Sequence, residues 1–126
     1  MKRPEVITKE YLDRNPNLVF VFGDNTDRVG MGGAAVLRYH PQSLGVVTKI
    51  HPDNEETSFY TPSNYLDKYL IEIQKLRDEI TNNPDKIFLI TKLGAGLANA
   101  YGIWDKIIEP TIKILLSDFQ NVEFLW

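Results

Sequence analysis

The sequence contains no cysteine and only two histidines. The absence of cysteine excludes disulfides, thiolate zinc sites and cysteine nucleophiles, and so few histidines argue against a catalytic zinc site. It also fits a reducing compartment, and we expect a cytoplasmic protein. Long apolar runs are lacking as well. No segment approaches the roughly 20 residues that cross a bilayer, and the first residues lack the apolar centre of a secretory signal.

No excess of positive charge is present. The formal net charge is −3, the charged residues are dispersed, and 43% of the residues are hydrophobic. A general nucleic-acid binder would carry a basic face, so this class is not expected. The 126 residues predict a single domain over residues 1–126. Residues 1–17 form an N-terminal preface with one short helix over Thr8 to Asn15, capped by Thr8.

Strand and helix patterns alternate along the rest of the chain. Short apolar runs predict strands over 18–22, 44–48, 87–90 and 122–125. Helices are expected over 33–39, from Ser63 as N-cap to about residue 80, and over 104–119, where Pro110 must lie near the first turn or kink the helix. This alternation predicts an α/β fold with a mostly parallel sheet of about four to five strands and helices on both faces. The long helix presents one apolar face, made of Tyr65, Leu66, Tyr69, Leu70, Ile73, Leu76 and Ile80.

A glycine-rich segment follows the first predicted strand and precedes a helix start. This first glycine loop (residues 23–33) opens with Gly23, Asp24 and Asn25 and continues to Gly30, Gly32 and Gly33, before Ala34 and Ala35. Accessible backbone N–H groups between a strand and a helix favour a phosphate or carboxylate ligand. The spacing fits neither the Walker pattern nor the dinucleotide fingerprint. The alternative is that the glycines serve only a tight turn and close packing.

A second glycine loop (residues 91–99) follows the third predicted strand, and Thr48-Lys49 ends the second. Parallel sheets bind ligands at the carboxyl ends of their strands, so both loops and Lys49 are expected to share one cleft. Lys49 would pair with a phosphate or act as a nucleophile, unless it is a solvated loop lysine. Asp24 would contact a ligand or act as a base, unless it only caps its own turn.

The other polar and aromatic candidates are weaker. Arg28 is an exposed loop charge that could reach a phosphate. His40 and His51 are interpreted as structural or surface residues. Phe59 or Tyr60 would stack on a base or pack beneath their loop, and Trp104 is expected to anchor the last helix in the core.

Three motifs together resemble the macrodomain fold, in the branch that includes glycohydrolases removing ADP-ribose from proteins and DNA. They are Arg28 to Val36 (RVGMGGAAV), Val47-Thr48-Lys49, and Leu93 to Leu97 (LGAGL) continuing to Trp104. The order and spacing agree over roughly residues 18–126. The sequence is also similar to a group of short phage and bacterial proteins with Phe-Val-Phe-Gly-Asp-Asn, Gly-x-Gly-Gly-x-Ala, Thr-Lys and Gly-x-Gly-x-x-Ala motifs.

The resemblance implies a three-layer α/β fold in which the two loops embrace a diphosphate, with Asn25 near the distal ribose. Lys49 matches the lysine that forms a covalent ribose adduct in the glycohydrolase branch, whereas Ala98 stands where that branch has an acidic residue. Lys49 and Asp24 are the catalytic candidates. The ligand-binding candidates are Gly23, Asp24, Asn25, Gly30, Met31, Gly32, Gly33, Ala34, Thr48, Lys49, Gly94, Ala95, Gly96, Leu97 and Ala98.

The leading hypothesis is a macrodomain-like module that binds ADP-ribose or a related nucleotide diphosphate as ligand, without a cofactor or a metal. Its partner would be the free nucleotide or an ADP-ribosylated macromolecule. We expect no association with a membrane. One alternative is an ADP-ribosyl glycohydrolase that uses Lys49. Another is a phage-type interaction protein that uses the scaffold to bind a host protein or a signalling nucleotide.

Overall fold

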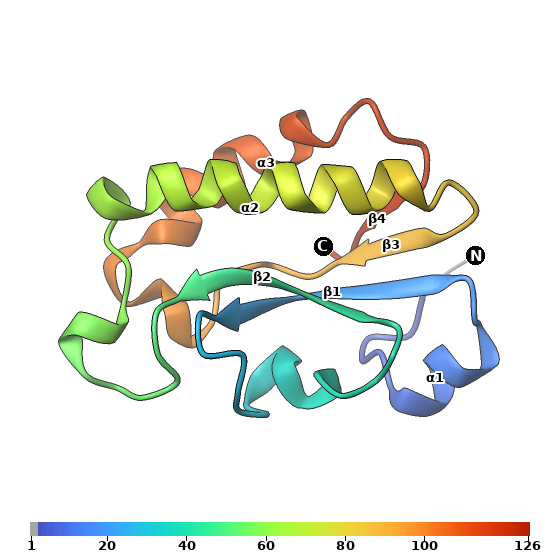
Figure 1. Cartoon of the computed structure of the whole chain (residues 1–126), viewed down its shortest axis with the longest axis horizontal. Coiled ribbons are helices and arrows are strands. Elements are labelled where there is room, and N and C mark those ends of the chain that lie inside the picture. Colours follow the sequence, from blue (N-terminus) through green and yellow to red (C-terminus); the bar gives the residue numbers. More distant parts are fainter. Residues whose placement is uncertain (1–2) are drawn as a thin grey trace.

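Four parallel strands form one sheet at the centre of the molecule, in the order β2-β1-β3-β4 (Figure 1). The computed structural model describes residues 3–126. The predicted α/β fold with a parallel sheet is confirmed, with a strand count at the lower end of the predicted range. The strands are β1 (Leu18–Asn25), β2 (Ser43–Lys49), β3 (Ile87–Ile90) and β4 (Val122–Phe124).

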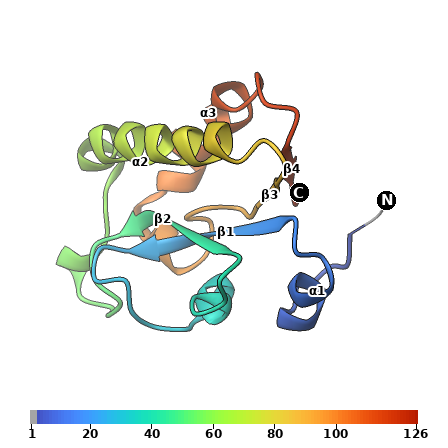
Figure 2. The ribbon, with the colours of Figure 1, turned by 45° about the vertical axis from the view of Figure 1, so that its right-hand side comes forward.

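Helices cover both faces of this sheet, which gives three layers (Figures 1 and 2). The long helix α2 (Pro62–Asn82) and α3 (Glu109–Leu115) lie on one face. Helix α1 (Lys9–Arg14) and the 3₁₀ helix η1 (Gly33–Leu37) lie on the other. Thr8 caps α1 through its hydroxyl as predicted. The remaining short helices are η2 (Glu56–Ser58), η3 (Leu97–Tyr101) and the π-helix η4 (Trp104–Ile108).

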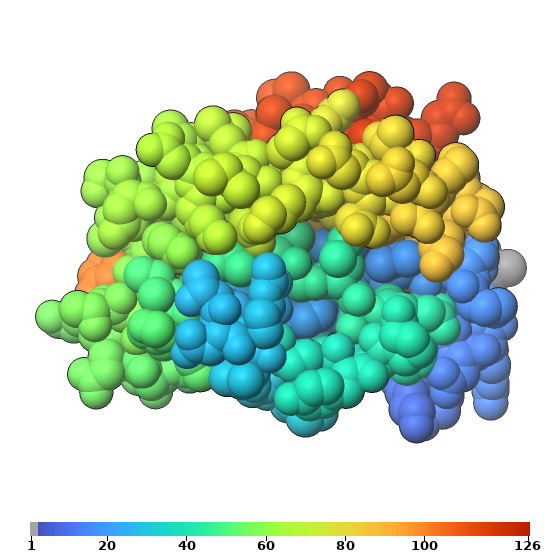
Figure 3. Space-filling model, in the orientation of Figure 1, coloured from blue at the N-terminus to red at the C-terminus, as the bar shows by residue number. Residues whose placement is uncertain are grey.

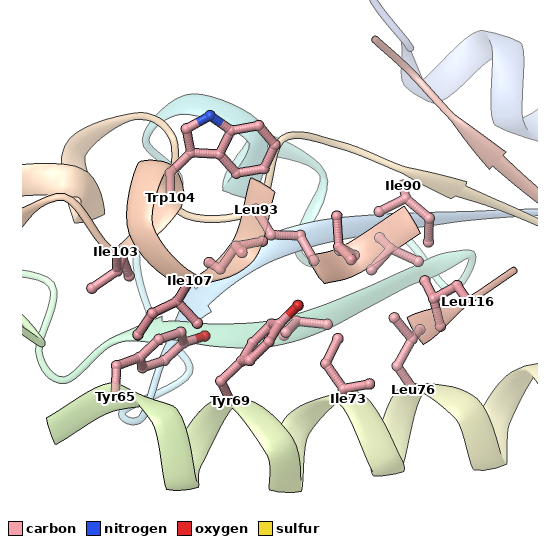
Figure 4. Packing of buried hydrophobic residues seen from close by; sticks show 14 of the residues in the cluster. Tyr65, Tyr69, Ile73, Leu76, Ile90, Leu93, Ile103, Trp104, Ile107 and Leu116 are labelled. Atoms are coloured by element: carbon pink, nitrogen blue, oxygen red, sulfur yellow. The ribbon is translucent and has the colours of Figure 1, made fainter. Parts of the chain in front are cut away.

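The larger hydrophobic core lies between the sheet and the layer of α2 and α3. Tyr65, Tyr69, Ile73 and Leu76 project from one side of α2 toward the sheet (Figure 4). Trp104 belongs to the same core, as expected. A second core on the opposite face joins the sheet to α1 and η1 through residues that include Leu12, Phe20, Phe22, Leu37 and Leu89.

The buried face of α2 is narrower than its sequence predicts. Leu66 and Leu70 are about half exposed, so their predicted place on that face is wrong. Each lies one residue, about 100° of helix rotation, from a buried tyrosine, and the sheet covers only the stripe through Tyr65 and Tyr69. Glu72 is buried in that stripe instead.

Several helix boundaries in the structure differ from the predicted boundaries by a few residues. The N-cap of α2 is Thr61 rather than Ser63, and Thr61 forms a capping box with Asn64. The last helix is split into η4 and α3, with Pro110 in the first turn of α3 as one prediction allowed. None of the helices within residues 3–126 combines the length and the apolar character needed to span a bilayer.

Two corrections concern the first glycine loop. Strand β1 does not end at Phe22, because Gly23 and Asp24 continue its pairing with Val46 and Val47 of β2. The helix expected over 33–39 is only the short 3₁₀ helix η1. Because its macrodipole is small, the free N–H groups of the loop, rather than a helix dipole, must attract an anion here.

Candidate functional site

The connections between successive strands lead in opposite directions across the sheet on either side of the boundary between β1 and β3. The connection after β1 leads outward to β2, whereas the connection after β3 leads to β4 on the opposite side. In open parallel sheets such a reversal leaves a crevice at the carboxyl ends of the strands. Both glycine loops leave the sheet at this crevice, because they follow β1 and β3.

A cavity of about 510 Å³ occupies this position. Its size falls within the roughly 300–1,000 Å³ typical of small-molecule sites. Every predicted site residue lines it except Met31, whose side chain is half exposed and lies outside the lining. The sequence interpretation missed six further lining residues, which are Val29, Ala35, Arg38, Pro52, Thr91 and Lys92.

The two glycine loops approach each other closely at the base of the cavity. A Cβ atom on Gly23 would lie 3.3 Å from the backbone nitrogen of Gly94 and 3.0 Å from Oγ1 of Thr48. Gly94 has a φ of +78°, a left-handed conformation that disfavours other residues. The backbone conformation therefore favours glycine at residue 94, and a side chain at residue 23 would push against Thr48 and the second loop.

Free backbone donors line both sides of this cavity. Within residues 3–126, the N–H groups of Gly30, Gly32, Gly94 and Gly96 have no hydrogen-bond acceptor. All four residues are part of the cavity lining. Gly94 is buried, and buried backbone donors are almost always satisfied, whereas Gly30, Gly32 and Gly96 are exposed at the mouth of the cavity. Together the four donors suit an acceptor-rich ligand between the loops.

Lys49 supplies a positive charge to the same cavity. It ends β2, is 8% exposed, and holds its ammonium 4.6 Å from the centre of the Phe59 ring. No carboxylate between residues 3 and 126 forms an ion pair with it. A buried cation is normally paired with an anion, so Lys49 is suited to an anionic ligand.

Asn25 provides an unsatisfied acceptor beside this charge. Its Nδ2 donates to the carbonyl of Val29 over 2.8 Å, which fixes the orientation of the amide. Its Oδ1 is buried and has no donor within the described part of the chain. A ligand hydroxyl or N–H group in the cavity would satisfy this oxygen.

Asp24 has both carboxylate oxygens occupied. Arg38 donates to Oδ1 over 2.6 Å and Arg28 donates to Oδ2 over 3.0 Å, while the N–H of Asn25 also reaches Oδ1. Burial would raise the pKa of Asp24, but these hydrogen bonds outweigh it and hold the pKa below its ordinary value. A carboxylate in this state is a weak base, and the geometry favours a structural role over the predicted catalytic one.

The backbone of Gly45 leaves room for that carboxylate. A Cβ atom at residue 45 would clash with Oδ2 of Asp24 and lie 2.9 Å from its Cβ. We expect Gly45→Ala to displace Asp24 from its arginines and lower the free energy of unfolding by about 2 kcal/mol in urea titration. The matched control is Gly32→Ala, since a Cβ on Gly32 meets no atom within 4 Å and the φ of −78° suits alanine. Equal stability of the two variants would contradict this expectation.

The remaining candidates lie outside the cavity or pack within the protein. His40 contacts Asp13 over 2.7 Å and His51 contacts Asp27 over 2.8 Å. Tyr60 packs on Tyr65, which agrees with the prediction that it packs beneath its loop. No cluster of three metal-binding side chains occurs within residues 3–126.

A second cavity, of about 630 Å³, runs along the outer edge of β2. In Figure 3 the surface of α2 (yellow-green) lies above the blue and cyan segments that form its other wall. Glu72 of α2 accepts the outward N–H of Val47 over 2.6 Å, and Arg28 donates to the carbonyl of Gly45 over 3.3 Å. Lys75 lies 3.2 Å from the other oxygen of Glu72. These side chains satisfy the open edge of the sheet, where a strand of another chain would otherwise pair.

Comparison with known proteins places this site within one family. No curated protein and no solved structure matches the chain. The sequence model of DUF7831 matches residues 2–103, which include β1 to β3, both glycine loops and Lys49. The chain therefore belongs to DUF7831, a family of unknown function.

Proposed function

We propose that this protein is a macrodomain-like module that binds ADP-ribose or a related nucleoside diphosphate in the cavity between the two glycine loops. One observation carries the proposal: Lys49, whose ammonium has no ion pair among residues 3–126, and N–H groups from both loops that have no acceptor there line the same cavity. A diphosphate offers several anionic oxygens that accept hydrogen bonds from backbone N–H groups of this kind. The absence of cysteine supports a cytoplasmic setting for this activity.

The remaining groups of the cavity suit the rest of such a ligand. The unsatisfied Oδ1 of Asn25 would accept a hydrogen bond from a ribose hydroxyl. Val29, Pro52 and Leu97 add apolar surface to the lining, against which a nucleobase would pack.

Binding is better supported than hydrolysis. Among residues 3–126, Asp24 is the only carboxylate residue in the cavity lining, and two arginines occupy its oxygens. Ala98 contributes only a methyl group where a hydrolase of the resembled branch has an acid. Incubating ADP-ribosylated protein or DNA with the wild type and Lys49→Ala tests this, and we expect equal, background-level release from both. Release by the wild type alone would establish the glycohydrolase alternative.

Isothermal titration with ADP-ribose, ADP and NAD tests the binding proposal directly. We expect saturable binding of ADP-ribose, with AMP as a control that lacks the diphosphate. Because both loops and Lys49 would contact phosphate, AMP should bind more weakly than ADP. No detectable binding of any of the diphosphates at millimolar concentration would refute the proposal.

A larger side chain at residue 32 would partly fill the cavity, and it allows an effect on ligand binding to be distinguished from an effect on folding. A Cβ atom on Gly32 would have no neighbour within 4 Å, and the backbone of Gly32 is in an extended conformation that other residues adopt. Gly32→Leu should therefore leave thermal stability nearly unchanged. We expect its affinity for ADP-ribose to fall about 10-fold or more, because the added side chain crowds the ligand. Unchanged affinity in Gly32→Leu would place the ligand elsewhere.

A further inference from the structure

Beyond the end of β1, side chains rather than strand pairing hold the rest of the first glycine loop in place. Its backbone is tied to the rest of the chain at its start, where the N–H of Thr26 donates to the carbonyls of Lys49 and Ile50. Further along, the carbonyls of Val29 and Gly30 accept hydrogen bonds from side chains. The shape of this cavity wall therefore depends on those side chains.

Arg38 is the main donor to the loop. Its Nε donates to the carbonyl of Gly30 over 2.7 Å, and its Nη2 donates to the carbonyl of Val29 over 3.1 Å. The Arg38 side chain is only 6% exposed, and its guanidinium lies 5.4 Å from the centre of the Phe22 ring. A planar guanidinium held in this way fixes two successive carbonyls at once.

Asp24 fixes Arg38 in turn. Nη2 of Arg38 lies 2.6 Å from Oδ1 of Asp24, and Arg28 within the loop lies 3.0 Å from Oδ2. The carboxylate side chain is 3% exposed and stands on β1, where Asp24 pairs with Val47 of β2. Each carboxylate oxygen thus accepts a hydrogen bond from a different arginine, and charge-assisted hydrogen bonds of this kind are stronger than neutral ones.

We propose that Asp24 and Arg38 are positioning residues, which hold the first glycine loop in the shape that presents its N–H groups to the ligand. The role in binding rests on the proposed function, whereas the ordering of the loop does not. Asp24 then acts through Arg38 and the loop rather than on the ligand. The same pair separates the two cavities, because both residues line each of them.

The test compares Asp24→Asn with Asp118→Asn, which breaks an equally close pair with Arg77 (2.7 Å) away from both cavities. Backbone ¹⁵N order parameters of residues 29–33 are measured without ligand. We expect them to fall from about 0.85 toward 0.6 in Asp24→Asn alone. Affinity for ADP-ribose should fall about 10-fold in the same variant, because binding must then order the loop.

Arg38→Lys provides a second variant if Asp24→Asn does not fold. Lysine keeps the charge but cannot bridge Asp24 and two carbonyls at once, so the loop should again become mobile. Order parameters and affinity equal to those of Asp118→Asn in a folded variant would overturn the proposal. If the wild type binds none of the nucleotides, the proposed function fails, and the order parameters still decide whether Asp24 and Arg38 hold the loop.

Discussion

Lys49→Met is expected to weaken ADP-ribose binding by about 10- to 100-fold, the largest loss among single substitutions in the cavity. The ammonium of Lys49 is the one buried cation of the lining without an ion pair among the described residues, so a phosphate would be its partner. Methionine keeps the approximate length of the lysine side chain and its packing against Phe59. Isothermal titration of both proteins with ADP-ribose measures the effect.

The same substitution should not lower stability. Removing a buried, unpaired cation relieves a desolvation cost, so the melting temperature of the ligand-free variant should stay equal or rise. Lys9→Met, at an exposed position of α1 outside the cavity, is the matched control and should change neither property. An affinity for ADP-ribose that survives in Lys49→Met would contradict the proposed site, provided that the variant is folded.

Leu76→Ala should have the largest effect on stability of the changes considered, about 3 kcal/mol. Leu76 is 2% exposed and packs between α2 and the sheet (Figure 4). Truncation there removes apolar contacts and leaves a cavity in the larger core. Thermal and urea unfolding, followed by circular dichroism, measure the change in the free energy of unfolding.

Leu66→Ala is the matched control on the same helix. The chemical change and the helix propensity are identical, and the sequence periodicity places both leucines on one face. Because Leu66 is 50% exposed, its truncation should cost within about 0.5 kcal/mol. Similar losses in the two variants would mean that Leu66 is covered in solution, contrary to the structure described here.

The general location of the candidate site could be predicted from the sequence. Apolar runs mark buried strands, and the alternation of strands with helices implies a parallel sheet. Residues that follow the strands must then meet at one edge, which is why Asn25, Lys49 and Gly94 line the same cavity. Met31 departs from this rule, because its side chain is half exposed and lies outside the lining although its neighbours Gly30 and Gly32 belong to it.

The charge pairs around the site could not be predicted in the same way. Arg38 follows the first glycine loop, and its position in the sequence predicts the last turn of a helix. No neighbouring sequence pattern indicates that its guanidinium contacts Gly30 and Asp24. Glu72 likewise resembles an ordinary surface residue of an amphipathic helix. Its burial follows from the position of α2 over the edge of β2, where Val47 needs an acceptor.

Local sequence patterns predict the alternation of strands and helices, the parallel sheet, and the loops that meet at its carboxyl edge. These features depend on local periodicity and on glycine, which act over a few residues. Tertiary contacts alone establish which side of α2 is buried, that Asp24 is bound by two arginines, and that Lys49 has no ion pair among the described residues. The partner of a charged side chain depends on which distant segments the fold brings within a few ångströms of it, and short-range sequence patterns carry no record of that distance.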